Sequence, residues 1–478
     1  MTDWEDAIEA ASAEFVEQLE QRGFHADGRM LTGDLPGIDG PIELRIELPD
    51  AFPFTPPIVS PPNDYPCSWH RELSGAMCLY PADGRENLPW LDVDNFLRTV
   101  ARWLDESASG WTADSPDLDL ERYFPQLPDE PLVVYGDLDS ITNRFIGFRR
   151  EKNVTRLVGA RSIPKGTQGL KRNRAFGYLA ALGEPDTPPA SWEDLKVMLP
   201  AEDAQSIESA VRDRRLEYLI VRYSRGGVDA AATLRASRSK SGTIELAAVR
   251  SASEAPLTLA LRAGPNAEKL SVASVAVVGA GAIGSFLCDL LARAGIGTIT
   301  VYDPDVVRPG NLIRHLAGAD MVGLAKVDAI KHLIESRPFN STRIRAVARP
   351  APPPQHIMSL FGEHDLVIDA SAAGGTTDML VKAATAGGHR LLTVCIQAEG
   401  GVVRVDVVPP LEGDSLAATD LGPTPSREDL RFEAGCGDPV SQTSAFAVLE
   451  AASLAARCAV GMLMGVPICT AGIIRDYR

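Results

Sequence analysis

The sequence has few cysteines, and none of them forms a Cys-x-x-Cys pair. Its 478 residues include 7 cysteines, an odd number scattered along the chain. Structural zinc sites use closely spaced cysteine pairs, and small secreted domains use a dense, even set of cysteines for disulfides. We therefore expect free thiols in a cytoplasmic protein, with neither a zinc site nor a disulfide framework.

The sequence also lacks a long apolar run and an excess of basic residues. The longest uncharged apolar stretch, residues 272–288, is interrupted by glycines, and the first residues carry no secretory signal. Lys and Arg number 47 against 64 Asp and Glu, which gives a net charge of −17. A surface this acidic repels phosphate backbones and anionic lipids. We therefore expect no nucleic-acid partner and no membrane partner.

The length of the chain predicts about two to four domains. Residues 1–112 combine helical periodicity with a strand of alternating apolar residues at 42–48, which predicts an α+β domain. Residues 113–131 are rich in proline and acids and are expected to form a linker. Residues 132–268 mix strand and helix patterns and predict a middle α/β domain of unknown role. Residues 269–478 alternate strands and helices, which predicts a doubly wound, Rossmann-like α/β domain.

A glycine-rich loop follows the first predicted strand of the C-terminal domain, in Val275-Ala-Val-Val-Gly279-Ala-Gly281-Ala-Ile-Gly284. Gly279 allows a tight turn, Gly281 lets the backbone approach a phosphate, and Gly284 lets the helix pack closely on the strand. The free N–H groups at the helix start form an anion site. Asp303 ends the next strand, where an acid can bind ribose hydroxyls. This pattern alone also fits a nicotinamide-dependent reductase, which remains an alternative.

Four further motifs follow this loop in a fixed order. They are Asp303-Pro-Asp305, Asn311-Leu-Ile-Arg314-His315, Gly323-Leu-Ala-Lys326 and Val367-Ile-Asp369-Ala. With these motifs, residues 269–478 resemble the adenylating domains of the ubiquitin-activating, ThiF and MoeB superfamily. The resemblance implies an adenylyltransferase that uses ATP and Mg²⁺.

The resemblance also implies roles for individual residues. The three loop glycines and Asp305 belong to the nucleotide site, Asp303 binds ribose, Asn311, Arg314 and Lys326 bind phosphates, and Asp369 places Mg²⁺. Arg314 would reach the ATP of the opposite protomer, which implies a homodimer through the adenylating domain. His315 departs from the family, in which Gln is common at this place.

Cys436 is a candidate nucleophile in Glu433-Ala-Gly-Cys436-Gly-Asp-Pro439, just before an apolar helix predicted over residues 440–464. A helix N-terminus stabilises a thiolate, and the flanking glycines leave the thiol accessible. By resemblance, its position matches the cysteine that takes a ubiquitin-like protein from its adenylate as a thioester. The other cysteines of this domain lie in apolar segments and are expected in the core.

Cys78 is a second candidate nucleophile. It lies in Gly75-Ala-Met-Cys78-Leu, after Phe52-Pro-Phe-Thr-Pro-Pro57 and before Trp90. This order resembles the ubiquitin-conjugating fold, in which a Phe-Pro-x-x-Pro-Pro motif precedes a loop with the catalytic cysteine. No His-Pro-Asn tripeptide precedes Cys78, and His70 is displaced from that position. The group that stabilises the oxyanion is therefore not identified by the sequence.

Together the two halves resemble the bacterial activating–conjugating fusions of CBASS antiphage operons. The resemblance implies that ATP activates a carrier protein with a free C-terminal tail, either a ubiquitin-like protein or a nucleotidyltransferase. Cys436 would pass the acyl group to Cys78, and an amine of a target protein would receive it in antiviral defence. The alternative is a sulfur-carrier protein adenylyltransferase in thiamin or molybdopterin synthesis, whose N-terminal domain only binds. A non-catalytic scaffold is a further alternative.

Overall fold

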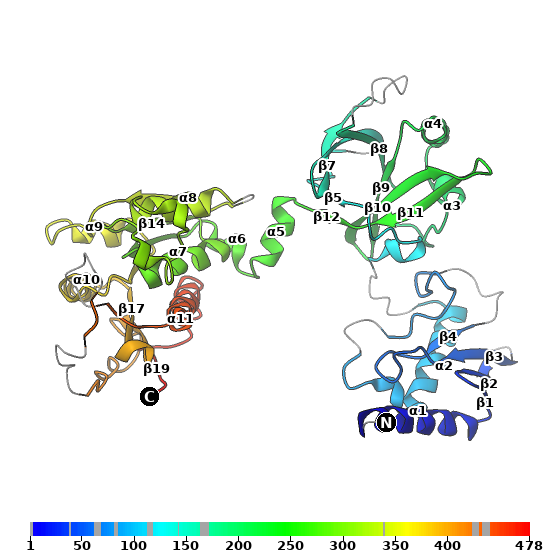
Figure 1. Ribbon diagram of the computed structural model, residues 1–478, viewed down its shortest axis with the longest axis horizontal. Coiled ribbons are helices and arrows are strands. Elements are labelled where there is room, and N and C mark those ends of the chain that lie inside the picture. Colours follow the sequence, from blue (N-terminus) through cyan, green and yellow to red (C-terminus); the bar gives the residue numbers. More distant parts are fainter. Residues whose placement is uncertain are drawn as a thin grey trace. The chain divides into compact units, whose positions relative to one another are not determined.

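The computed structural model describes most of the chain in two compact units, Met1–Glu254 and Ala255–Arg478 (Figure 1). The described residues are 3–37, 40–61, 68–80, 85–111, 118–141, 143–162, 172–337, 340–422, 430–432 and 440–478. The division between the units falls after β12, close to the predicted start of the C-terminal domain at residue 269.

The N-terminal part of unit 1 packs two helices against a small sheet. Its elements are α1 (Asp3–Glu20), β1 (His25–Asp27), β2 (Met30–Gly37), β3 (Gly40–Glu47), β4 (Ile58–Ser60), the 3-10 helix η2 (Pro89–Leu91) and α2 (Val93–Ser109). Strands β1 to β4 pair antiparallel in chain order. Leu44 and Ile46 of β3 point inward and pack with Phe15 of α1 and Phe96 of α2. The alternating pattern predicted for this strand is thus the pattern that builds the core.

The second part of unit 1 is a mixed sheet covered by two helices. Its elements are η3 (Leu120–Tyr123), β5 (Leu132–Tyr135), β6 (Arg144–Arg150), β7 (Val154–Ala160), β8 (Arg174–Ala181), α3 (Trp192–Met198), α4 (Ala201–Arg212), β9 (Tyr218–Arg225), β10 (Val228–Arg238), β11 (Ile244–Val249) and β12 (Ser251–Ser253). Within the described residues the strand order is β11-β10-β9-β8-β6-β7-β5-β12. Helices α3 and α4 bury Trp192 and Ile207 against Leu219 and Leu234 of the sheet.

The segment predicted as a linker, residues 113–131, is packed from Leu118 onward, where the structure describes it. Leu120 and Tyr123 of η3 are 0% and 2% exposed and lie in the core of the mixed sheet. Trp69 of the N-terminal part enters the same core and stacks on Tyr223, with ring centroids 5.6 Å apart. The two parts of unit 1 therefore share a core. The composition of residues 113–131 indicated a linker because prolines and acidic residues outnumber the few apolar residues that pack into the core.

Unit 2 is a seven-stranded sheet, within the described residues, with helices on both faces. Its elements are α5 (Pro256–Arg262), α6 (Ala267–Leu270), β13 (Ser274–Val278), α7 (Ala282–Arg293), β14 (Thr298–Tyr302), η5 (Pro309–Asn311), η6 (Ala319–Met321), α8 (Lys326–Glu335), β15 (Arg343–Val347), α9 (Ile357–Gly362), β16 (Leu366–Asp369), α10 (Gly374–Gly387), β17 (Leu391–Gln397), η7 (Ala398–Gly400), β18 (Val402–Val408), α11 (Ala445–Leu463) and β19 (Gly472–Asp476). The order is β15-β14-β13-β16-β17-β18-β19, parallel up to β17 and antiparallel beyond it. The predicted doubly wound fold of the C-terminal domain is confirmed.

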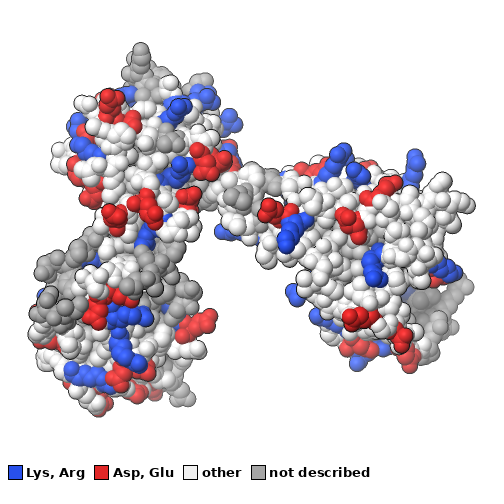
Figure 2. Space-filling view, turned by 180° about the vertical axis from the view of Figure 1, so that it is seen from behind, with Lys and Arg blue, Asp and Glu red and all other residues white. Residues whose placement is uncertain are grey.

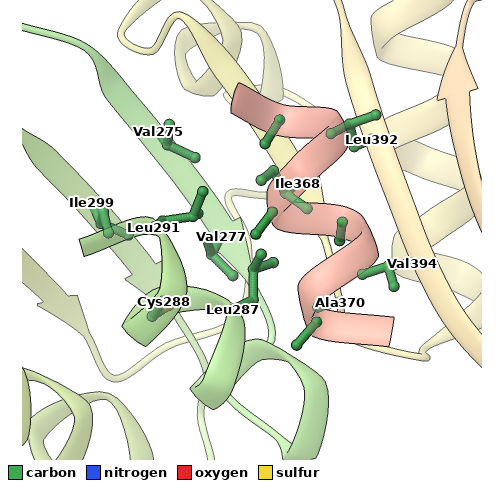
Figure 3. Close-up of a cluster of buried hydrophobic side chains, with 14 of the residues drawn as sticks. Val275, Val277, Leu287, Cys288, Leu291, Ile299, Ile368, Ala370, Leu392 and Val394 are labelled. Carbon is green, nitrogen blue, oxygen red and sulfur yellow. The ribbon is translucent and has the colours of Figure 1, made fainter. Parts of the chain in front are cut away.

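Helix α11 is the apolar helix predicted before the C-terminus. Its length and its mean hydropathy of 1.6 would suit a membrane span, but half of its most apolar window is buried. Figure 3 shows it packed beside α7, in a cluster that includes Leu287 and Leu291 of α7 and Ile368 and Val394 of the sheet. This burial is that of a core helix in a globular domain.

Candidate functional site

The glycine-rich loop of unit 2 lies at the carboxyl end of β13 and leads into α7. Gly279 has a φ of +97°, and a Cβ there would lie 2.6 Å from the Cα of Ser371. A Cβ on Gly284 would lie 1.9 Å from the carbonyl oxygen of Gly279. Gly281 is the N-cap residue of α7 and faces open space. Two positions thus require glycine for packing, and the third leaves room for a ligand.

Asp303 and His315 hold this loop from two sides. The Ala280 N–H donates to Asp303 Oδ2 at 2.7 Å, and His315 Nε2 lies 2.8 Å from the Ala280 carbonyl oxygen. The Ala317 N–H donates to His315 Nδ1 at 3.0 Å, so the neutral tautomer with its proton on Nε2 satisfies both contacts. Burial lowers the pKa of His315, which favours this neutral form. The loop is therefore fixed through both polar groups of Ala280.

A cavity of about 160 Å³ opens beside the loop. It is lined by Gly281, Ala282, Asn311, Arg314, His315 and Lys326. Lys326 begins α8, and its Nζ contacts Asp305 Oδ2 at 2.9 Å while its side chain is only 12% exposed. Cationic side chains beside a helix N-terminus form a site for a phosphorylated ligand. The structure thus brings residues of three sequence motifs to one cavity: the glycine-rich loop, the motif at 311–315 and the motif at 323–326.

Arg314 lies at the cavity of its own chain. Its Nη1 donates to the carbonyl oxygen of Thr443 at 3.2 Å, just before α11. The resemblance implied that Arg314 reaches the ATP of the opposite protomer. Its place beside Gly281 and Lys326 instead favours a role within its own chain.

Asp369 ends β16, in register with Val278 at the end of β13, and is 2% exposed. Its Oδ1 accepts from the N–H and hydroxyl of Ser371 at 3.0 and 2.6 Å, and Oδ2 accepts from the Thr377 hydroxyl at 2.5 Å. A carboxylate offers about four acceptor positions, so one remains. Across the described ranges there is no cluster of three or more His, Cys, Asp or Glu side chains that could hold a metal. Asp369 thus fits Mg²⁺, which takes one carboxylate and completes its shell with phosphate oxygens and water.

Four cysteines of unit 2 lie among the described residues. Cys436 lies outside the described residues. Cys288 and Cys458 are buried, and Cys395 and Cys469 are half-buried. Burial raises the pKa of the Cys288 and Cys395 thiols, and it raises that of Cys458 to about 12. These three thiols stay protonated at neutral pH and are poor nucleophiles.

Cys78 of unit 1 is half-buried and lines a groove of about 360 Å³. Its N–H donates to the His70 carbonyl oxygen at 2.8 Å, which fixes the loop. Trp90 is fully buried, and its Nε1 donates to the Pro53 carbonyl oxygen at 2.8 Å. The His70 ring stacks on Trp111, with centroids 3.5 Å apart. The Cys78 loop is thus bonded to the backbone of His70, whose ring packs on Trp111.

Arg122 is a residue of this site that the sequence analysis missed. Its Nη1 lies 3.4 Å from Cys78 Sγ, although the two residues are 44 positions apart. It comes from η3, inside the predicted linker. No motif marks Arg122, so only the fold could place it at the sulfur.

The match to a known protein family concerns unit 2. Residues 255–466 match the model of the ThiF family. The chain is 32% identical over 111 residues to the ATP-dependent ubiquitin transferase-like protein Cap2 of Vibrio cholerae, covering 22% of this chain and 18% of Cap2. It is 37% identical over 108 residues to the adenylyltransferase and sulfurtransferase uba4 of Pyricularia oryzae, covering 22% of this chain and 21% of uba4.

Among solved structures, E. coli MccB with ATP aligns with a TM-score of 0.34 and 20% identity, over 44% of this chain and 64% of MccB. The chain spans about a fifth of the length of the curated relatives that it matches. The family match covers nearly all of unit 2, from α5 to the end of α11. The C-terminal half of this chain is therefore a ThiF family domain.

Proposed function

We propose that the ThiF domain is an adenylyltransferase that activates the C-terminal carboxylate of a carrier protein. The observation that carries this proposal is the cavity at the glycine-rich loop, where Arg314 and Lys326 face the start of α7. A triphosphate needs this combination of backbone N–H donors and fixed cations. The family match, and the similarity to Cap2 and uba4, support the same class of reaction.

In this reaction the carrier carboxylate attacks the α-phosphorus of ATP, an O–P bond forms, and pyrophosphate leaves. Arg314 and Lys326 offset the negative charge that develops on the phosphates. Asp303 Oδ2 accepts the Ala280 N–H and Oδ1 accepts the Asp305 N–H, which leaves an acceptor position on each carboxylate oxygen for the ribose hydroxyls. Asp369 would hold Mg²⁺, which neutralises phosphate charge when bound.

We propose that the acyl group then moves through two thioesters. The Cys436 thiolate attacks the acyl-adenylate carbonyl and AMP leaves. Cys78 takes the acyl group by transthioesterification, and a target amine finally displaces Cys78 to form an amide. The order of α1, four antiparallel strands, the Cys78 loop, Trp90 and α2 supports a ubiquitin-conjugating-like role for the N-terminal part.

The proposed carrier is a ubiquitin-like protein or a CBASS nucleotidyltransferase, acting in cytoplasmic antiviral defence. Figure 2 shows acidic and basic side chains interspersed on the visible face of each unit, without an extended basic area there. With the net charge of −17, this surface favours a protein partner over nucleic acid.

We propose that the protein forms a homodimer through the adenylating domain. The segment that leads from η5 to α8 exposes apolar side chains: Ile313 is 80% exposed, Val322 42% and Leu324 46%. Contiguous exposed apolar patches mark surfaces that associate. A second copy of the chain would cover them.

The alternative is a sulfur-carrier protein adenylyltransferase, which the match to uba4 favours. In that case Cys78 would be dispensable and the N-terminal part would only bind. Pyrophosphate exchange would still occur, but no adduct would form on Cys78.

Ordered loss along the relay tests the proposal. The assay uses ATP with ubiquitin-like proteins and nucleotidyltransferases as candidate carriers. Cys436→Ala should support pyrophosphate exchange but carry no reducible adduct, whereas Cys78→Ala should load Cys436 and stop there. Cys469→Ala, a half-buried thiol outside the relay, serves as the control and should retain both adducts. Conjugation by Cys78→Ala would favour the sulfur-carrier alternative, and absence of exchange in the wild type would overturn adenylation itself.

A further inference from the structure

Arg122 places a positive charge at the sulfur of Cys78. Its Nη1 lies 3.4 Å from Cys78 Sγ, and its side chain is only 17% exposed. Guanidinium carries five N–H donors and stays protonated at any physiological pH. We propose that Arg122 is a catalytic residue that holds Cys78 as a thiolate, an inference that rests on the proposed transfer function of Cys78.

Two carboxylates fix the orientation of this guanidinium. Arg122 Nε lies 3.4 Å from Asp119 Oδ2, in the same short helix, and Nη1 lies 3.8 Å from Glu72 Oε1, in the Cys78 loop. The pair to Glu72 ties η3 to the loop that carries the nucleophile. The guanidinium is thus held between the two segments instead of extending into solvent.

The mixed sheet of unit 1 and the backbone of Trp69 anchor the helix from which Arg122 projects. Leu120 is fully buried, and its N–H donates to the Tyr223 hydroxyl at 3.1 Å. The Tyr123 hydroxyl donates to the Trp69 carbonyl oxygen at 2.8 Å. These bonds flank Arg122 on both sides in the sequence. The middle part of the chain, which carries no chemical motif of its own, therefore builds the cysteine site by positioning η3.

The proposed transfer needs a Cys78 thiolate twice. In transthioesterification the thiolate attacks the thioester carbonyl on Cys436, its C–S bond forms, and Cys436 leaves as a thiolate. In aminolysis the target amine attacks, the C–N bond forms, the C–S bond breaks, and Cys78 leaves as a thiolate while the extra amine proton passes to solvent. Arg122 takes no part in proton transfer and donates a hydrogen bond to the sulfur in both steps.

The other charged groups around Cys78 determine whether a substitution stabilises or destabilises its thiolate. Glu72 and Arg85 line the same groove as Cys78, and Asp119 faces Arg122 from η3. Glu72 and Asp119 offset part of the charge of Arg122. Removing Glu72 should therefore strengthen the attraction of Arg122 for the thiolate, whereas removing Arg122 should leave the sulfur without the guanidinium that contacts it.

Alkylation of Cys78 tests the inference without any carrier protein. The full chain is treated with iodoacetamide between about pH 6 and 9, and mass spectrometry follows the Cys78 peptide. At pH 7, Arg122→Gln should react about tenfold more slowly than the wild type, with its pH midpoint moved upward. Glu72→Gln should react faster, and Arg122→Lys, which keeps the charge, should stay near the wild type. Arg222→Gln removes another ion-paired arginine of unit 1, one bound to Asp139, and should react like the wild type.

The outcomes separate charge from packing. Equal pH profiles of alkylation for Arg122→Gln and the wild type would overturn the inference. Equal losses of alkylation rate in Arg122→Lys and Arg122→Gln would also overturn it, because they would indicate a role of Arg122 in packing. Arg122-dependent alkylation in a protein that forms no Cys78 thioester would refute the proposed transfer function while the thiolate inference stands. A Cys78 thioester that forms and transfers normally in Arg122→Gln would overturn the catalytic role alone.

Discussion

Protonation of His315 should loosen the glycine-rich loop of the ThiF domain. His315 is 5% exposed, Nδ1 accepts the Ala317 N–H at 3.0 Å, and Nε2 lies 2.8 Å from the Ala280 carbonyl oxygen. A proton on Nδ1 would turn this acceptor into a donor that faces another donor. The hydrogen bond to Ala317 would be lost and a charge would be buried, so acid should weaken the loop.

The sign and size of the change in the free energy of unfolding follow from the protons that the folded and unfolded chains bind. Burial lowers the pKa of folded His315 below its ordinary 6.5, with the hydrogen bond to Ala280 acting against it, Lys326 in the same direction and Asp303 against it. Below about pH 6.5 the unfolded chain binds a proton that the folded chain does not. The free energy of unfolding should therefore fall as pH drops, by up to about 1.4 kcal/mol per pH unit, until the folded pKa is reached. Above about pH 6.5 the contribution is constant.

Hydrogen exchange measured by mass spectrometry on the full chain checks this expectation. The matched variant is His315→Gln, because Gln can accept from Ala317 and donate to Ala280 but does not titrate in this range. Protection of amides in β13 and α7, corrected for intrinsic rates, should fall in the wild type relative to the variant by up to about tenfold per pH unit below 6.5. His364, also buried in unit 2, is present in both proteins and cancels. Identical pH dependence in the two proteins would refute the reasoning.

Three further perturbations address the nucleotide site. Asp369→Asn should reduce carrier-dependent pyrophosphate exchange at least about a hundredfold while the domain stays folded, and wild-type exchange would contradict its role. Gly284→Ala should lower the free energy of unfolding by about 2 kcal/mol or more, because its Cβ would lie 1.9 Å from the Gly279 carbonyl oxygen; an unchanged melting temperature would contradict this packing. Mixing Arg314→Ala with Asp369→Asn subunits should restore no exchange, because both residues serve the site of their own chain; recovery to about a quarter of wild-type activity would instead place Arg314 at the partner's site.

The sequence predicted the elements of unit 2 because their signals are local. The strand of residues 275–278, the glycine spacing behind it and the acid that ends β14 lie close together in the chain and have fixed spacing. Where helix α8 starts is less local: it begins only at Lys326, after the short helix η6. Since Gly323 takes a φ of +94°, the chain turns there before the helix starts.

The sequence could not predict contacts that tertiary packing creates. His315 was visible only as a departure from a family pattern, yet its ring fixes the loop through Ala280, 35 residues away. Arg122 had no signal at all, since a single arginine in a proline-rich segment resembles any solvated charge. Such contacts depend on where distant segments meet, which periodicity does not encode.

The shared core around Trp69 limits how this protein can be divided or exchanged with its relatives. Trp69 is 4% exposed, stacks on Tyr223 and lies 4.5 Å beneath the Arg225 guanidinium. A fragment that stops at residue 112 would expose this indole to water and would also lack Arg122. The N-terminal part is therefore not a portable module. Any chimaera that transplants the cysteine site must carry Met1–Glu254 as a single cassette, and the natural point for exchanging modules in this chain is the entrance to α5.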